Sequence, residues 1–322
     1  MTLRTTSTFI LLLFMLLMAT SSQATCARNA AGAIIVDADG GSEMVNSSNQ
    51  AAGEDANQCQ EIPNNYLIKF FKFGICTDDP INAAGEDPDF SSCSFMLDKA
   101  LGVDHVIKMP NVGNLPTGDF DIPPGTYTHM VGVMSNRFGI KHTETFSEAL
   151  RGLTGTGTTC WSIADKVTAY TNETVDNDTN THDAVATDNA PDTNTLECGG
   201  AADANPGFSY EVINVFSNAC SSFDGYWDSG AGRTMSNGTA EAKLLQNDNS
   251  AASDCEDATR MLWVVQWTAP KKVTKTSQFS LEFKLTDSVS VDLSSDGSTG
   301  YAVKMGADPV TSILTVTEPS LD

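Results

Sequence analysis

Residues 279–285 read Phe-Ser-Leu-Glu-Phe-Lys-Leu and alternate apolar with polar side chains at every position. A β-strand needs this period of two when one of its faces is buried and the other meets water. Residues 288–293 repeat the alternation through Val289, Val291 and Leu293. Two such segments in succession indicate an antiparallel sheet with one solvated face.

Segments of strand length recur along the whole chain, separated by turn residues. The richest in aromatic and β-branched side chains is residues 66–75, Tyr-Leu-Ile-Lys-Phe-Phe-Lys-Phe-Gly-Ile. The best candidate for a helix is a short one at residues 241–246. This pattern predicts an all-β fold, an antiparallel β-sandwich or barrel with a long polar insertion and disulfides. The other expected strands are residues 33–36, 94–97, 105–109, 127–134, 208–216, 261–268, 300–305 and 312–316.

Residues 122–134, IPPGTYTHMVGVM, contain a turn that leads into a strand. We expect that strand to have one covered face, carrying Tyr127, His129, Val131 and Val133. The segment resembles the Pro-Gly-Thr-Tyr signature of prealbumin-like β-sandwiches, which implies a central strand with Tyr127 packed at its start. The stretch 66–143 also resembles uncharacterised exported proteins of marine bacteria, through Gly-Ile-Cys at 74–76 and Asp-Phe-Ser-Ser-Cys at 89–93. Those resemblances imply secretion and a β-fold, and no activity.

The charge of the chain restricts its partners. The 322 residues include 18 Lys+Arg and 41 Asp+Glu, which gives a net charge of −23. Nucleic acids and anionic membrane surfaces are therefore not expected as partners, because both need basic patches.

The first 24 residues have the features of a secretory signal peptide. Arg4 precedes an apolar run at residues 9–18, and Ser22 and Ala24 supply the small residues of a cleavage site. No later apolar stretch approaches eighteen residues, so no membrane span is expected after cleavage. We therefore expect a secreted or cell-surface protein.

The chain contains eight cysteines, an even number that implies disulfides in an exported protein. We expect each cysteine to pair with its neighbour in sequence, since each pair then closes a local loop. Zinc binding is the rival interpretation, but the cysteine spacings fit no zinc pattern. The expected pairs are Cys26 with Cys59, Cys76 with Cys93, Cys160 with Cys198, and Cys220 with Cys255.

Changes in composition divide the chain into five parts. Residues 151–207 are poor in large apolar side chains, so we expect an exposed insertion stapled at its base by disulfides. Residues 208–322 are either the second half of one sandwich or a second β-domain. The expected parts are the signal peptide at 1–24, a polar segment with one short strand at 25–63, the first half of a sandwich at 64–150, the insertion at 151–207, and residues 208–322.

No pattern in the sequence indicates a catalytic site, and no cofactor is expected other than calcium. His129 lies in an expected strand, where a structural role is the simpler interpretation. The alternating acids and amides Asp176, Asp178 and Asn180 resemble the start of a calcium loop, but Thr181 stands where such loops have glycine. Solvated turns produce the same pattern.

Two groups of aromatic side chains could contact a sugar. Phe223, Tyr226 and Trp227 lie in an expected loop and are the candidates for ligand binding. Trp263 and Trp267 alternate on a strand with Val265 between them, which is more typical of a sandwich core.

These features favour an exported structural protein that is not an enzyme. We expect a subunit of an extracellular filament or cell-surface layer that self-associates through β-strand contacts, with residues 25–36 or 312–317 as the donated strand. The alternative is an extracellular adhesin or glycan-binding module. A secreted hydrolase is the third hypothesis.

Overall fold

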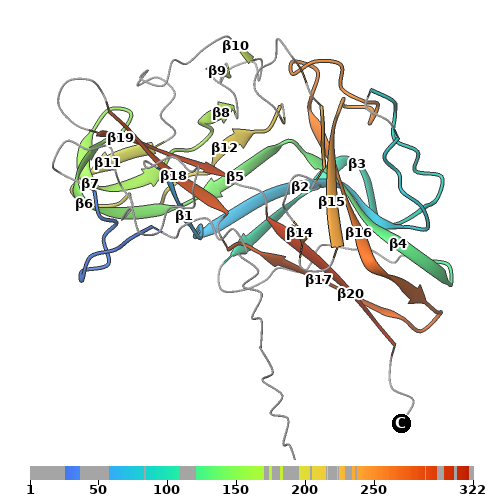
Figure 1. The fold of residues 1–322 in the computed structure, drawn as a ribbon. Coiled ribbons are helices and arrows are strands. Elements are labelled where there is room, and N and C mark those ends of the chain that lie inside the picture. Colours follow the sequence, from blue (N-terminus) through green and yellow to red (C-terminus); the bar gives the residue numbers. More distant parts are fainter. Residues whose placement is uncertain are drawn as a thin grey trace, which may run out of the picture.

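The computed structural model is all-β, and its sheets are mainly antiparallel (Figure 1). Three disulfides join cysteines within the described residues. The described residues form strands, turns and bends, and none of them belongs to a helix that could cross a bilayer. They are residues 26–36, 58–82, 85–108, 121–169, 174–175, 182–183, 196–203, 205–214, 216, 223, 225–228, 234–235, 238–286, 288–295, 301–307 and 310–318.

A ten-stranded sheet, here called the large sheet, forms the centre of the molecule. Its strands follow the order β13-β15-β16-β4-β2-β5-β12-β8, with β14 beside β15 and β3 beside β2. All its neighbours are antiparallel except β12 and β8. The strands are β2 (Asn65–Cys76), β3 (Cys93–Lys108), β4 (Gly125–Ser135), β5 (Arg137–Lys141), β8 (Val167–Ala169), β12 (Ser209–Val212), β13 (Tyr226–Asp228), β14 (Thr234–Met235), β15 (Gly238–Leu245) and β16 (Arg260–Val273).

A six-stranded sheet, here called the small sheet, lies at the left in Figure 1, and β2 runs from it towards β4 and β16. A two-stranded ribbon lies below the large sheet and joins β17 (Gln278–Lys284) to β20 (Thr311–Thr317). A second short pair joins β9 (Thr174–Val175) to β10 (His182–Asp183). The small sheet contains β1 (Gln58–Glu61), β18 (Val289–Ser295), β19 (Tyr301–Ala307), β6 (Thr143–Arg151), β7 (Thr156–Ser162) and β11 (Leu196–Gly199), in that order.

One hydrophobic core joins both sheets and the ribbon. It contains Phe70 and Met130 from the large sheet, Val289 from the small sheet, and Phe283 and Leu314 from the ribbon. The prediction of one buried and one solvated face at 279–285 is confirmed, since the polar residues are exposed while the apolar residues face this core. Strand β16 pairs with β4, so residues 64–150 and 208–322 both contribute strands to the large sheet.

Strand β4 is buried on both faces, so the expectation of a single covered face was wrong. Met130 and Met134 face the main core, while Val131 and Val133 belong to a second apolar cluster. The second cluster lies under the segment after β2, which contributes Ile81 and Phe90. The Cys76–Cys93 disulfide closes this covering segment against β2 and β3.

The Pro-Gly-Thr-Tyr turn enters β4, a central strand of the large sheet. The Tyr127 hydroxyl donates a hydrogen bond to the carbonyl of Pro123 at 2.8 Å, and the side chain is 3 % exposed. A buried tyrosine satisfied in this way fixes the angle at which the turn meets the strand.

Three of the four expected disulfides are confirmed: Cys26–Cys59, Cys76–Cys93 and Cys160–Cys198. Cys255 is disulfide-bonded as well, but its expected partner Cys220 lies outside the described residues. The confirmed pairs close loops of 33, 17 and 38 residues in sequence separation, respectively.

Two expectations of secondary structure need correction. Residues 241–246 do not form a helix, because β15 pairs with β16 along its whole length and buries Ala240, Ala242 and Leu244. Residues 151–207 are not all insertion, since β7 and β11 pair at the edge of the small sheet. Cys160 and Cys198 lie directly opposite each other in that pair, so the disulfide staples the base of the insertion as predicted.

Candidate functional site

The first polar cluster lies where residues 26–36 join the small sheet. These residues make a tight turn in which Arg28 is bridged to Ile34. The Ile34 N–H donates to the Thr145 carbonyl on β6, and the Ile34 carbonyl accepts from the Ser147 N–H. At the other end, the Cys26 N–H donates to the Gln60 carbonyl on β1. The segment therefore fills the space between β1 and β6.

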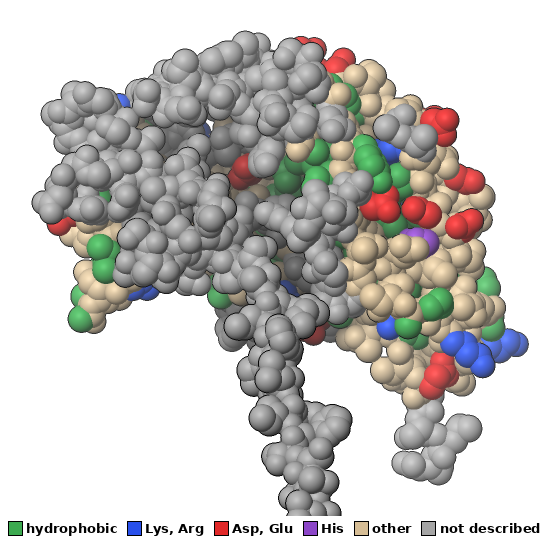
Figure 2. All heavy atoms as spheres, viewed as in Figure 1, with side chains coloured by type: hydrophobic (Ala, Val, Ile, Leu, Met, Phe, Trp, Pro, Cys, Tyr) green, Lys and Arg blue, Asp and Glu red, His purple; other side chains and the backbone are tan. Residues whose placement is uncertain are grey.

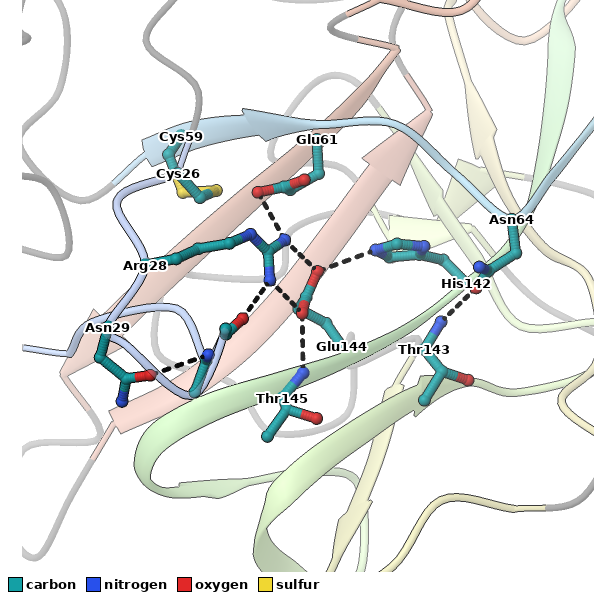
Figure 3. Close-up of polar contacts among 12 residues, drawn as sticks. Cys26, Arg28, Asn29, Cys59, Glu61, Asn64, His142, Thr143, Glu144 and Thr145 are labelled. Carbon is teal, nitrogen blue, oxygen red and sulfur yellow. Dashed lines mark hydrogen bonds and ion pairs between the residues drawn. A yellow bond between two sulfur atoms is a disulfide. The ribbon is translucent and has the colours of Figure 1, made fainter. Parts of the chain in front are cut away.

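Arg28 ties this segment to both neighbouring strands (Figure 3). Its guanidinium donates two hydrogen bonds to Glu144 on β6, at 2.8 and 2.7 Å, and forms an ion pair with Glu61 on β1 at 2.7 Å. His142 Nε2 lies 3.4 Å from Glu144 Oε2. The Cys26–Cys59 disulfide lies beside the cluster and joins residues 26–36 to β1.

The two carboxylates respond differently to the same surroundings. Burial raises the pKa of Glu61, and the charge of Arg28 only partly opposes the effect. Burial also acts to raise the pKa of Glu144, but hydrogen bonds from Arg28, His142 and the Thr145 backbone outweigh it and lower the pKa to about 2. Carboxylates with separated pKa values can serve as an acid and a base. Here both are nine-tenths buried or nearly so and bound to Arg28, which favours a structural clamp.

A second cluster lines an open groove of about 610 Å³ between β2, β3 and the start of β16 in the large sheet. One wall is a bulge in β3, where residues 99–102 stand opposite the single residue Phe71 of β2. Gly102 has a φ of +70°, which favours glycine, and completes the bulge. The other wall is the turn at residues 247–249 that leaves β15. Bulges at sheet edges often shape binding sites, so we take this groove as the candidate functional site.

Arg260, at the start of β16, holds the two walls of the groove together. Its guanidinium donates to Asn249 Oδ1 at 2.7 Å, to Asn247 Oδ1 at 3.0 Å and to the Ala100 carbonyl at 3.4 Å. The same group stacks on the ring of Phe71, 3.7 Å from its centre. Arg260 is only 6 % exposed, so these contacts fix its position and the shape of the groove.

The rim of the groove is cationic and partly apolar. Lys72 pairs with Asp98 at 2.7 Å, and Lys69 lies 3.9 Å from Asp104. Lys99 is exposed and makes no hydrogen bond or ion pair within the described parts of the chain. Beside it, Leu101 is 88 % exposed, the highest exposure among the large apolar side chains that the structure describes.

The three aromatic ligand candidates are partly buried and contact other side chains of the fold. Trp227 stacks on Trp263 with ring centres 5.6 Å apart, and Tyr226 donates its hydroxyl to Glu241. Phe223 packs against the main core. The pairing of β13 with β15 brings Trp227 onto the sheet, and the role of the three candidates in ligand binding stays a prediction.

The remaining predicted site residues are structural or lie outside the described residues. His129 is 4 % exposed, contacts the Thr128 hydroxyl, and has a pKa lowered by burial, in agreement with a structural role. Val265 and Trp267 pack in the core with the partly buried Trp263, as predicted. The calcium candidates Asp176, Asp178 and Asn180 fall outside the described residues, and the part of the chain that is described contains no group of three or more metal-ligating side chains.

No pattern in the sequence pointed directly to the groove. Its residues come from β2, β3, the turn after β15, and β16, which are distant in sequence. The only available signal was the break in alternation at Lys99, Ala100, Leu101 and Gly102, inside a segment otherwise suited to a strand.

Comparison of the chain with protein-family models, with curated proteins and with solved structures finds no match.

Proposed function

We propose that the protein is an exported structural subunit that assembles into an extracellular filament or cell-surface layer by exchanging a β-strand between copies. The observation that carries the proposal is the ribbon of β17 and β20. Among the described residues these two strands pair only with each other, so a single ladder holds β20 in place. When that ladder opens, the edge of β17 presents unpaired backbone groups to which the β20 strand of another copy can add.

Strand β20 is the segment best suited to exchange. It forms a single ladder of seven residue pairs, so its transfer breaks one ladder and forms an identical one in a neighbour. Leu314 is 3 % exposed, and its place in the core would be refilled by the same residue of another copy. Residues 25–36 are the poorer donor, because the Cys26–Cys59 disulfide and the Arg28 cluster hold that segment within its own chain.

The proposal includes a prealbumin-like sandwich as the finer description of the fold. The hydrogen bond from Tyr127 to Pro123 and the central position of β4 support that arrangement. The three intrachain disulfides among the described residues support export into an oxidising compartment.

A covalent lock between β17 and β20 tests strand exchange. Ser280 and Thr315 are exposed and lie directly opposite each other, as the native pairs Cys76–Cys93 and Cys160–Cys198 do. We expect wild-type protein to form ordered assemblies in electron micrographs, and the variant Ser280→Cys with Thr315→Cys to stay monomeric until the exposed bond is mildly reduced.

The matched control is Thr239→Cys with Gln266→Cys, which locks two exposed, opposed residues of β15 and β16. This control should assemble like the wild type. Assemblies formed by the locked ribbon variant, or wild-type protein that stays monodisperse at high concentration, would overturn the proposal.

A further inference from the structure

The groove between the β3 bulge and the 247–249 turn concentrates positive charge in a strongly acidic chain. Lys69, Lys72, Lys99 and Arg260 line it, against two aspartates, whereas the whole chain has 18 basic and 41 acidic residues. Figure 2 likewise shows acidic side chains spread over the visible face of the described part. The groove is therefore a place where an anion meets attraction within a surface that otherwise repels it.

The wall formed by the 247–249 turn also offers neutral hydrogen-bond donors. A guanidinium group only donates, so the two asparagine atoms that accept from Arg260 must be the carbonyl oxygens Oδ1. The Nδ2 groups of Asn247 and Asn249 are consequently left to donate to solvent or to a ligand. A lining of ammonium and amide donors selects a ligand rich in acceptor oxygens.

The cations do not converge on one point. Lys69 and Lys72 pair with different aspartates and lie three residues apart on β2. Leu101, in the β3 bulge, adds an exposed apolar contact. A single inorganic anion would use little of this surface, whereas a chain of sugar rings presents charges, hydroxyls and apolar faces along its length.

We infer that the groove binds an oligosaccharide that carries carboxylate or sulfate groups. Lys99 and Lys69 would meet the charged substituents, the Asn247 and Asn249 amides would donate to hydroxyl or ring oxygens, and Leu101 would cover an apolar face of a sugar. The inference does not depend on strand exchange, and it can be tested on the monomer locked through Ser280→Cys and Thr315→Cys.

Titration calorimetry with three size-matched probes tests the inference: an oligogalacturonate, a dextran sulfate oligosaccharide and neutral dextran. At least one anionic probe should bind and the neutral one should not, and the two anionic probes distinguish carboxylate from sulfate as the preferred group. The variant Lys99→Glu should weaken binding about tenfold, which corresponds to the loss of one charge-assisted hydrogen bond.

The control is Lys272→Glu, an identical charge change at an exposed position twelve residues from Arg260 on the same strand. It should alter the affinity less than about twofold at fixed ionic strength, since distant charges are screened. Equal weakening by both variants, or binding of neutral dextran as tight as that of the anionic probes, would overturn the inference. So would the absence of anionic binding at millimolar concentration. Binding to phosphatidylglycerol vesicles that is tighter than binding to the sugar probes, and that is lost when Leu101 is replaced, would also overturn it.

Discussion

Arg28 and Glu144 are joined by two parallel hydrogen bonds, from Nη1 to Oε1 at 2.8 Å and from Nη2 to Oε2 at 2.7 Å, across 116 residues of sequence. This geometry is the strongest form of an arginine–carboxylate pair. It lies at the joint where residues 26–36 fill the space between β1 and β6. The pair therefore couples the attachment of the N-terminal segment to the integrity of the small sheet.

Replacing Arg28 with alanine should destabilise the fold by about 3 kcal/mol, because two largely buried carboxylates, Glu61 and Glu144, lose their cation. Urea unfolding with the disulfides intact measures the change. The double variant Arg28→Ala with Glu144→Gln should lose less than the sum of the two single variants. A cost for Arg28→Ala below about 0.5 kcal/mol would show that the pair behaves like an exposed salt bridge.

The contribution of Glu61 and Glu144 to the free energy of unfolding should be largest near pH 4.5. Burial raises the pKa of Glu61 in the folded state above 4.5, so folding favours its protonated form and stability increases as the pH falls towards 4.5. Glu144 has a folded pKa of about 2, so it contributes stability above 4.5 that is lost as the pH falls from 4.5 to about 2.

The variant Glu144→Gln isolates the acidic side of this profile. Between pH 5 and pH 2 the wild type should lose about 2 to 3 kcal/mol more than this variant. Urea midpoints measured across that range give the difference. Parallel curves for the two proteins would mean that Glu144 titrates alike in the folded and unfolded states.

Removal of the Cys160–Cys198 bridge should cost about 3 to 4 kcal/mol in the chain-entropy model. The bridge closes a loop with a sequence separation of 38 and joins directly opposed residues of β7 and β11 at the sheet edge. Thermal unfolding of the double serine variant measures the loss. The matching variant of Cys76–Cys93, with a separation of 17, should lose slightly less, and the reverse order would contradict the loop-length argument.

Gly102→Ala should cost about 2 kcal/mol, and Gly85→Ala about 1 kcal/mol. Both glycines have positive φ, +70° and +82°. An added Cβ at Gly102 would lie 2.8 Å from Lys69 Cγ, whereas one at Gly85 would meet nothing within 4 Å. Urea unfolding of the two variants separates the backbone cost from the contact. Equal losses would show that the β3 bulge relaxes freely around the new methyl group.

Local patterns predicted the strands and the disulfides for a physical reason. Alternation at 279–285 depends only on neighbouring side chains, and the structure keeps it in β17. Pairing between neighbouring cysteines closes short loops, and three such pairs are present. The expected helix at 241–246 failed because pairing with β16 outweighs a weak local preference.

The sequence by itself therefore determined the all-β class, the turn before β4 and the three bridges that the structure describes, since each depends on residues close together in the chain. Only the tertiary structure decided that Arg28 meets Glu144, that β4 is covered on both faces, and that Lys99 and Arg260 face one groove. Those contacts depend on strand order and on a register shift between β2 and β3. Order and register are set by the packing of the whole core, which no single segment encodes.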